Sequence, residues 1–255
     1  MSEVLRAGYG ARNRPASIVG FNAANDALAA WSTPSADSIV ESEDEFENRF
    51  QVRVADSSSR RVRASSLIQR RYAWRGYAAS PLANDSPSRV TLSAFIEDET
   101  VATITAGIDG DDGLYVAELY GEEVDALRCR GRRLCEFTKL AVDESVRGHT
   151  VLGAIFHVAC TYAIDVHRCT DVLIEVNPRH VRFYERMLGF EQVAEERLDP
   201  AVQAPAVLLR LDLGHCANEM TRLGGRRKSA GERSFYPFFL SPAHSAQIVS
   251  RLQRC

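Results

Sequence analysis

The sequence lacks a long apolar run and a secretory leader. No stretch approaches the ~20 apolar residues that are needed to cross a bilayer. The first twenty residues contain Arg6, Arg12 and Arg14 but no compact apolar block before a small-residue cleavage site. We therefore expect a cytoplasmic protein without a secretory signal or an integral membrane segment.

Cysteine pairs and metal-ligand spacings are also missing. The six cysteines form no C-x-x-C pair, and most of them lie in segments with apolar patterning. The histidines show no H-x-x-x-H or H-x-E spacing, so neither a bound metal nor a disulfide framework is expected. Cys135 has no His and Asp partners that the sequence can place. We expect it to be a buried core cysteine rather than a nucleophile.

An excess of positive charge is missing as well. With 31 Lys and Arg against 34 Asp and Glu the net charge is −3 at pH 7, which argues against bulk binding to nucleic acid. Hydrophobic residues at 45% and charged residues at 25% are typical of globular proteins, so wholesale disorder and a fibrous repeat are excluded. A chain of 255 residues accommodates one large domain with appendages.

Composition divides the chain into three parts. Residues 1–48 are dominated by Gly, Ala, Ser and Asn and end in an acidic run, so we expect a mobile leader. Residues 49–214 carry regular hydrophobic patterning and form the predicted domain. Residues 215–255 are basic, and the apolar segment Phe235–Leu240 gives them an anchor. This extension is expected to pack back on the domain.

Hydrophobic periodicity within the domain predicts an alternation of strands and helices. Segments with strand patterning are 50–54, 90–96, 101–108, 134–142, 172–176 and 207–213, and the second and third form a hairpin. Segments with helical spacing are 64–72, 119–130, 151–166 and 180–188. Gly189 ends the last helix, because glycine readily takes the left-handed conformation at a helix end.

This order of elements is that of the GCN5-related N-acyltransferase (GNAT) fold, and three local segments narrow the resemblance. Asn177–Phe190 resembles the asparagine-to-glycine element of that superfamily, with Tyr184 and Gly189 inside it. Glu136–Asp143 resembles the E-x-[ST]-[RK]-[FL]-A-V-D strand of acyl-homoserine-lactone synthases. Together with 176–180 and 204–209 it is similar to the FeeM-type long-chain N-acyl amino acid synthases. The resemblance covers roughly residues 50–213, with a weaker echo at 233–237.

The resemblance implies an α/β (α+β) protein with a mixed, mostly antiparallel central sheet flanked by helices. It implies an N-acyltransferase that joins a long-chain acyl group from acyl carrier protein to the α-amine of an amino acid. The donor would be the phosphopantetheine thioester of the carrier, and no cofactor would be bound permanently. Two alternatives stay open: an acyl-CoA-dependent N-acetyltransferase of a small amine, and a non-catalytic ligand sensor with the same fold.

One stretch departs from the pattern of coenzyme-A-dependent acyltransferases. These enzymes usually have [RQ]-x-x-G-x-[GA] at the start of the long helix, where bare backbone amides receive a pyrophosphate. Here Thr150 and Leu152 stand where the pattern requires small residues. Arg147 and the helix amides remain suited to the single phosphate of a phosphopantetheine arm. The sequence thus favours a carrier-protein donor.

Acyl transfer to an amine requires a base, because an α-amine with a pKa near ~8 is mostly protonated at neutral pH. Glu136 lies on an otherwise apolar strand, so we predict a desolvated carboxylate that serves as the general base. The alternative is a structural ion pair with Lys139 or a nearby arginine. Regular alternation would separate Glu136 from Lys139, and only a β-bulge would bring them to one side.

Other catalytic roles follow from the resemblance. It implies that backbone amides near Leu140, Ala141 and Val142 stabilise the oxyanion and line the phosphopantetheine site. Tyr184 is the candidate proton donor to the departing thiolate, or one more residue of an apolar helix face. Asn177 either pairs with the amides of the pantetheine arm or forms an Asx turn with the proline that follows it.

Two groups of side chains are candidates for substrate contacts. By analogy with acyl-homoserine-lactone synthases, Arg71 and Trp74 are predicted to bind the acceptor, with Arg71 clamping its carboxylate. A basic patch at the donor entrance would steer an acidic carrier protein. For each arginine the alternative is a solvated surface charge. The predicted docking residues are Arg130, Arg133, Arg179 and Arg182.

Overall fold

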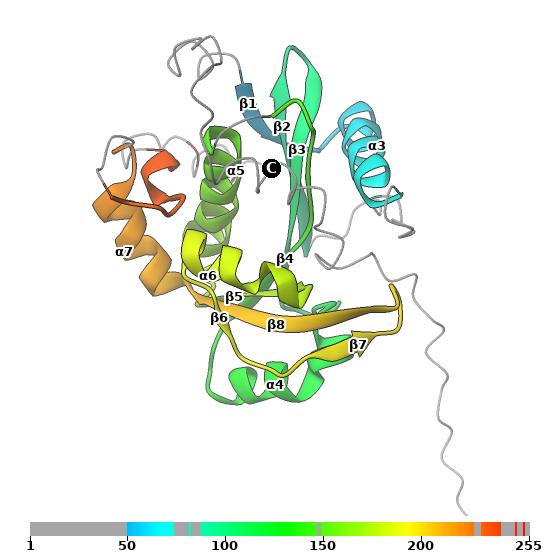
Figure 1. Ribbon diagram of the computed structural model, residues 1–255, viewed down its shortest axis with the longest axis vertical. Coiled ribbons are helices and arrows are strands. Elements are labelled where there is room, and N and C mark those ends of the chain that lie inside the picture. Colours follow the sequence, from blue (N-terminus) through cyan, green and yellow to red (C-terminus); the bar gives the residue numbers. More distant parts are fainter. Residues whose placement is uncertain are drawn as a thin grey trace, which may run out of the picture.

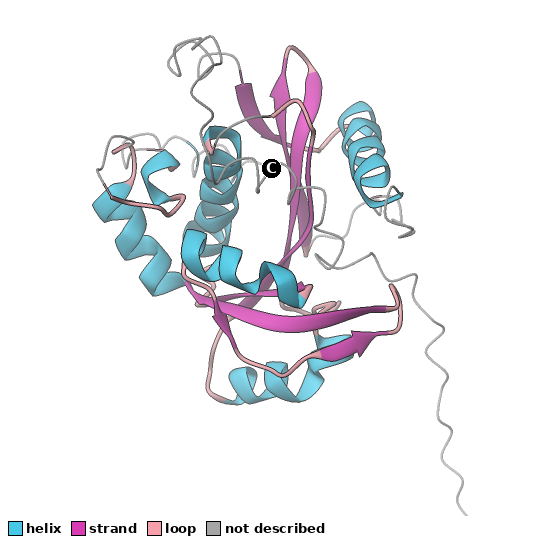
Figure 2. Cartoon of the chain, in the orientation of Figure 1, coloured by secondary structure: helices cyan, strands magenta, loops and turns pink. Residues whose placement is uncertain are grey.

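The computed structural model describes residues 50–73, 82, 88–146, 149–226, 231–240, 248 and 252. In this part of the chain, helices cover both faces of one mixed sheet (Figures 1 and 2). The expected fold class is therefore confirmed. The leader predicted at residues 1–48 lies outside the described residues.

The sheet contains one parallel pair of strands. Its order is β1-β2-β3-β4-β5-β8-β6, with β7 paired to β8, and all neighbours are antiparallel except β4 and β5. A parallel pair needs a crossover, which α5 provides between β4 and β5. The strands are β1 (Phe50–Val54), β2 (Arg89–Ile96), β3 (Glu99–Ile108), β4 (Leu134–Val142), β5 (Asp171–Val176), β6 (Glu191–Gln192), β7 (Arg197–Asp199) and β8 (Ala204–Asp212).

Four of the five α-helices in the described part agree with predicted ones, but α7 was not predicted: its first residue was assigned to the last strand and most of its length to the basic extension. The long helix ends its α-helical part at Thr161 and continues as a π-helix over Tyr162–Val166, and a 3-10 turn over Pro178–His180 precedes α6. In the described part of the chain no helix combines the length and apolar character that a membrane span requires. The α-helices are α3 (Ser58–Ala73), α4 (Ala117–Cys129), α5 (Thr150–Thr161), α6 (Val181–Leu188) and α7 (Leu213–Leu223).

The apolar layers on the two faces of the sheet differ in extent. The face covered by α5, α6 and α7 holds one large core, to which β4 contributes Cys135 and Phe137. The other face holds smaller clusters, among them one with Leu134 beneath α4 and one with Ala141 beneath α3. Because side chains alternate along a strand, Glu136 of β4 points to this second face, between the two clusters.

The described part of the C-terminal extension packs on the domain. The Phe235 amide donates to the Met187 carbonyl at 2.8 Å, and the Tyr236 hydroxyl donates to the Leu188 carbonyl at 2.6 Å. The boundary expected between residues 214 and 215 falls inside α7. This helix continues directly from β8, and the side chain of Asp212 caps it by accepting the amide of His215 at 3.0 Å.

Gly153 of α5 marks the closest approach of this extension. A Cβ atom at Gly153 would lie 2.6 Å from Cβ of Phe238, whereas one at Gly121 of α4 would meet nothing within 4 Å. We expect Gly153→Ala to lower the free energy of unfolding by roughly 1–3 kcal/mol through overpacking. The control Gly121→Ala should change it by less than about 0.5 kcal/mol, because the added Cβ meets nothing and the position follows a kink of α4 at Tyr120.

Urea denaturation of the full chain measures both effects. If Gly153→Ala lowers the free energy of unfolding no more than Gly121→Ala does, the extension does not pack on α5 as described.

Candidate active site

The two central strands separate after a short common stretch. β4 and β5 pair only where Leu134–Glu136 lies beside Asp171–Leu173, although both strands continue beyond these residues. β4 then stays with β3, and β5 stays with β8 (Figure 1). Beyond Glu136, the edges of β4 and β5 that face each other form no further ladder hydrogen bonds with each other. We call this divergence of the two strands the opening between β4 and β5.

A β-bulge lies on β4 at this opening. Thr103 pairs with Ala141 and Thr105 with Thr138, so Lys139 and Leu140 together oppose a single residue of β3. Lys139 has a φ of 49°, and its carbonyl accepts the hydroxyl of Thr103 at 2.9 Å. The bulge interrupts the alternation of side chains directly after Glu136 and Thr138. A regular strand would have placed Lys139 on the α5 face.

Glu136 is buried within a row of residues that crosses three strands. Arg89 of β2 pairs with Gly107 of β3, which pairs with Glu136, and all three lie on the face that carries α3 and α4. Arg89 Nη2 donates to Glu136 Oε1 at 3.3 Å, and the Val116 amide donates to Oε2 at 3.1 Å. A Cβ atom on Gly107 would lie 3.0 Å from Oε1 of Glu136. The glycine leaves the space through which Arg89 reaches the carboxylate.

The ionisation of Glu136 reflects two opposed effects. Burial raises its pKa, while the backbone amide of Tyr115, the charge of Arg89 and the amide of Val116 act in the opposite direction. Arg89 is fixed in turn, because it donates to the carbonyl of Gly113 at 2.7 Å and stacks over the Tyr115 ring at 3.9 Å. The carboxylate thus combines desolvation with an ion pair. The ion-pair partner is Arg89, not Lys139.

Lys139 is the second buried charge of β4. Its side chain is 7% exposed, and burial, assisted by the nearby charge of Arg89, lowers its pKa to about 8. In the described part of the chain, neither a hydrogen bond nor an ion pair reaches its Nζ atom. The sequence signalled Lys139 only as a possible partner of Glu136, since the bulge cannot be read from residue types.

The ionisation of Tyr184 is affected by a tyrosine from a different apolar cluster. Tyr184 of α6 belongs to the core around α5, and Tyr72 of α3 belongs to the cluster beneath α3. Burial, and secondarily Tyr72, raise the pKa of Tyr184. The buried hydroxyl of Tyr72 has no hydrogen-bond partner among the described residues. The high pKa of Tyr184 suits a hydrogen-bond donor to a departing thiolate better than a strong acid.

Comparison with known proteins identifies the family. The sequence profile described as N-acyl amino acid synthase FeeM matches residues 63–212, more than half of the chain. The chain belongs to the FeeM family. The structure of FeeM, an N-acyl amino acid synthase from uncultured soil microbes, matches with a TM-score of 0.60 and 26% identity, over 67% of this chain and 95% of that one. No curated protein matches the chain.

Two other solved structures also match, with lower TM-scores. The acyl-homoserine-lactone synthase LasI matches with a TM-score of 0.47 and 11% identity, over 64% of this chain and 90% of that one. An acyl-CoA N-acyltransferase from Pseudomonas aeruginosa matches with a TM-score of 0.44 and 15% identity, over 63% of this chain and 97% of that one. The expected GNAT fold is confirmed, and membership of the FeeM family makes the chain an N-acyltransferase.

In this FeeM-family chain, both polar side-chain atoms of Asn177 form hydrogen bonds within the fold. Its Oδ1 atom accepts the Arg179 amide at 3.3 Å, which closes the Asx turn, and its Nδ2 atom donates to the carbonyl of Pro205 at 3.3 Å. The asparagine therefore ends β5 and ties that end to β8. A contact with the pantetheine arm stays a prediction.

The remaining predicted donor residues lie near the opening or outside the described part. Leu140, Ala141 and Val142 are buried on β4, beyond the last residue that pairs with β5. Their backbone is thus beside the opening, where the resemblance predicts the oxyanion amides. Arg147 of the donor site and Trp74 of the acceptor site lie outside the described residues.

Arg71, the predicted carboxylate clamp, already contacts a carboxylate. Its Nη1 atom forms an ion pair with Glu144, and the Arg71 side chain is 12% exposed. The neighbouring Arg70 pairs with Asp143 at 3.5 Å. Both arginines therefore tie the end of α3 to the segment after β4. Binding of a substrate carboxylate at Arg71 would have to compete with Glu144.

The four arginines predicted to dock a carrier protein are all exposed, but they do not form one patch. Arg133 directly precedes β4, and Arg130 lies just before it, whereas Arg179 and Arg182 follow the end of β5. β4 and β5 are parallel and start side by side, so the two pairs lie at opposite ends of β5. A strand of this length spans roughly 15–20 Å. Only Arg179 and Arg182 lie at the end where the strands separate.

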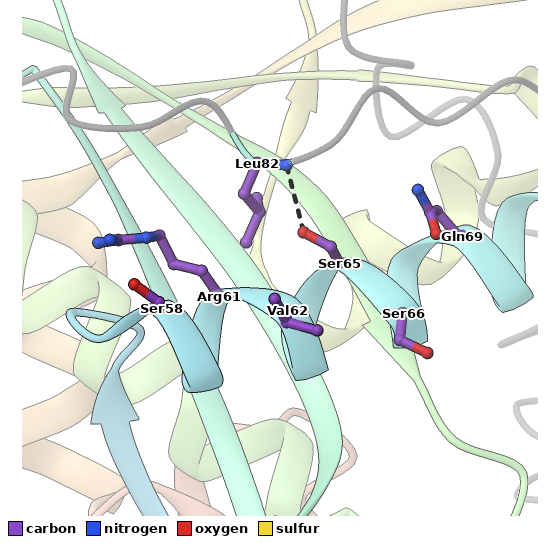
Figure 3. A pocket seen from close by; sticks show the side chains of 7 residues that line it. All are labelled: Ser58, Arg61, Val62, Ser65, Ser66, Gln69 and Leu82. Carbon is purple, nitrogen blue, oxygen red and sulfur yellow. Dashed lines mark hydrogen bonds between the residues drawn. The ribbon is translucent and has the colours of Figure 1, made fainter.

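A hollow on α3 lies away from this site. It has a volume of about 490 Å³, and the Leu82 amide donates to Ser65 Oγ at its edge at 3.3 Å (Figure 3). Its lining belongs to a different face of α3 from the residues that pack on the sheet: Ser58, Arg61, Val62, Ser65, Ser66, Gln69 and Leu82. Across the described segments, no three His, Cys, Asp or Glu side chains gather as a metal site requires.

Proposed function

We propose that this FeeM-family chain joins a long-chain acyl group, carried as a phosphopantetheine thioester on acyl carrier protein, to the α-amine of an amino acid. The observation that supports this reaction is the opening between β4 and β5 with a buried carboxylate, Glu136, at its start. Thioester, amine and base can meet there, with bare β4 backbone beside them.

The residues divide the chemistry as follows. The amine nitrogen attacks the thioester carbonyl carbon, and the C–S bond breaks when the tetrahedral intermediate collapses to the amide. Glu136 accepts the proton that the nitrogen loses, and desolvation makes it a stronger base than an exposed carboxylate. Amides of Leu140 to Val142 stabilise the oxyanion. A hydrogen bond from Tyr184 stabilises the thiolate, which takes its proton from water.

The start of α5 favours a donor with a single phosphate over coenzyme A. Val151 and Leu152 are buried in the first turn. The ring of His149 lies edge-on to Phe235 and Phe238, with centroid distances of 5.3 and 5.2 Å. Bulky side chains thus surround the helix start, where a pyrophosphate would need open backbone amides. A phosphopantetheine arm makes a smaller demand, with one phosphate near Arg147.

Steady-state rates with three donors test this function. We expect long-chain acyl carrier protein to exceed both long-chain acyl-CoA and acetyl-CoA at equal concentration with a mixture of amino acids. Each methylene that enters the apolar opening favours longer chains by about 0.8 kcal/mol. Mass spectrometry of the products identifies the acylated acceptor. Efficient use of acetyl-CoA would replace this proposal with an ordinary acetyltransferase.

Glu136→Gln tests the general base. Glutamine keeps the size of the side chain and an oxygen for the Val116 amide, but it accepts no proton from the amine, so kcat should fall by roughly a hundredfold or more. In the wild type, activity should decline as the pH falls through the raised pKa of Glu136. The variant should lose this acidic limb. A folded variant with most of its activity would assign Glu136 a structural role only.

Charge reversal tests the docking surface. Arg179→Glu with Arg182→Glu should raise the KM for acyl carrier protein and flatten its salt dependence, because rim charges act on encounter. The matched control is Arg130→Glu with Arg133→Glu at the opposite end of β5. Its KM should stay within about twofold of the wild type, as isolated surface charges have small effects. Docking at this end would be contradicted if both pairs of substitutions raised the KM for acyl carrier protein equally. It would also be contradicted if Arg179→Glu with Arg182→Glu lowered the activity with a short pantetheine thioester.

A further inference from the structure

The side chain of Lys139 is almost wholly buried, and no counterion for its ammonium group lies in the part of the chain that the structure describes. The side chain is 7% exposed, and besides burial the charge that acts on it is that of Arg89, which has the same sign. Burial of a charge without a partner is strongly unfavourable. An anion that enters from outside the protein would remove this cost.

The backbone of Lys139 provides a second, independent observation. Its φ of 49° lies in the left-handed region, which is uncommon for residues other than glycine and asparagine. Such strained residues concentrate at ligand and catalytic sites, where the surrounding structure holds them in place. Here the bulge and the hydroxyl of Thr103, which donates to the Lys139 carbonyl at 2.9 Å, hold the strained residue.

Among the described residues, the charges around Lys139 leave one positive charge without a compensating anion. Arg89 directs Nη2 to Glu136 and to the carbonyl of Gly113, and its Nε atom is buried without a hydrogen-bond partner. Glu136 is therefore compensated by Arg89, and Lys139 remains as the second cation. Glu175, another buried carboxylate, lies on β5, where its charge acts on Tyr120.

The choice of lysine is also informative. Lys139 is one of two lysines, the other being Lys228, among 31 basic residues. Nearly all basic residues of this chain are arginines, yet the bulge carries a lysine, whose ammonium group is compact. A compact point charge binds one carboxylate end-on and needs less space than a planar guanidinium.

We propose that Lys139 binds the α-carboxylate of the acceptor amino acid. This inference rests on the proposed function, because it names the group that recognises an amino acid as such. Glu136 precedes Lys139 on the same strand, so a carboxylate held by Lys139 leaves the α-amine on the side of the base. Arg71, the clamp expected from the sequence, is occupied by Glu144.

The test compares two acceptors that differ in charge. The probes are the amino acid that product analysis identifies and its carboxamide, which keeps the amine but lacks the negative charge. In Lys139→Gln the KM for the amino acid should rise roughly 10–100-fold, as expected for the loss of a charge-assisted hydrogen bond. The KM for the carboxamide should change less than about threefold, because the carboxamide carries no negative charge for Lys139 to bind.

Two further variants test whether the preference for the acid depends on Lys139 or on another cation. Arg71→Gln removes the competing cation, and Arg70→Gln removes an exposed cation of the same helix; both should keep the preference for the acid. The inference is overturned if Arg71→Gln abolishes that preference. It is also overturned if Lys139→Gln lowers kcat equally for acid and carboxamide, since Lys139 would then act on the oxyanion.

A measurement without acyl donor separates this inference from the proposed function. Lys139→Met keeps an unbranched side chain, one atom shorter, and the strained backbone but removes the charge, so at pH 7 the Tm of the ligand-free protein should rise by at least about 3 °C. Addition of the amino acid should raise the Tm of the wild type more than that of the variant. A lower Tm for Lys139→Met would show that the charge has a stabilising partner within the protein, and would overturn the inference.

The combined outcomes distinguish the two failures. If the wild type acylates amino acids and Lys139→Gln keeps the preference for the acid, only the role of Lys139 fails. If the wild type acylates amines that lack a carboxylate and no amino acid, the proposed function fails, and the carboxylate role of Lys139 fails with it.

Discussion

The separation of β4 from β5 is the constraint on which the rest of the site depends. Two parallel strands that pair over three residues and then diverge leave backbone groups without ladder partners, in the middle of a sheet where such groups are normally satisfied. Tertiary structure holds the strands apart, because β4 remains paired with β3 and β5 with β8. In the reaction that we propose, a substrate with its own amide groups would offset the cost of the missing ladder. A carrier-bound pantetheine arm has that chemistry.

The same region concentrates buried charge on the less apolar face of the sheet. Beneath α3 and α4 the apolar surface is divided into small clusters, and Arg89 and Glu136 lie between two of them. The cross-strand contact exists because Gly107 has no side chain. Lys139 adds a second cation through the bulge. Such an arrangement lowers stability relative to an apolar core, since desolvated charges repay their cost only with well-placed partners. The large core around α5 provides the compensating stability.

Local sequence patterns were sufficient for most of the fold. β5 was predicted over 172–176 and is found at Asp171–Val176, because a strand that is buried on both faces leaves a nearly continuous apolar signature. α6 ends at Leu188 because Gly189 takes a φ of 79°. The family was also readable, since Glu136–Asp143 and Asn177–Phe190 are contiguous segments whose residue types follow one another along the chain.

What the sequence by itself determined are the elements, their order, the family and the buried carboxylate Glu136, because each depends on neighbouring residues. The tertiary structure decided the partners: Arg89 rather than Lys139 for Glu136, Glu144 for Arg71, and opposite ends of β5 for the two pairs of arginines. Register across strands and the position of a bulge set these contacts. Both arise from long-range pairing, in which a shift of one residue moves a side chain to the other face, and that choice leaves no local signal.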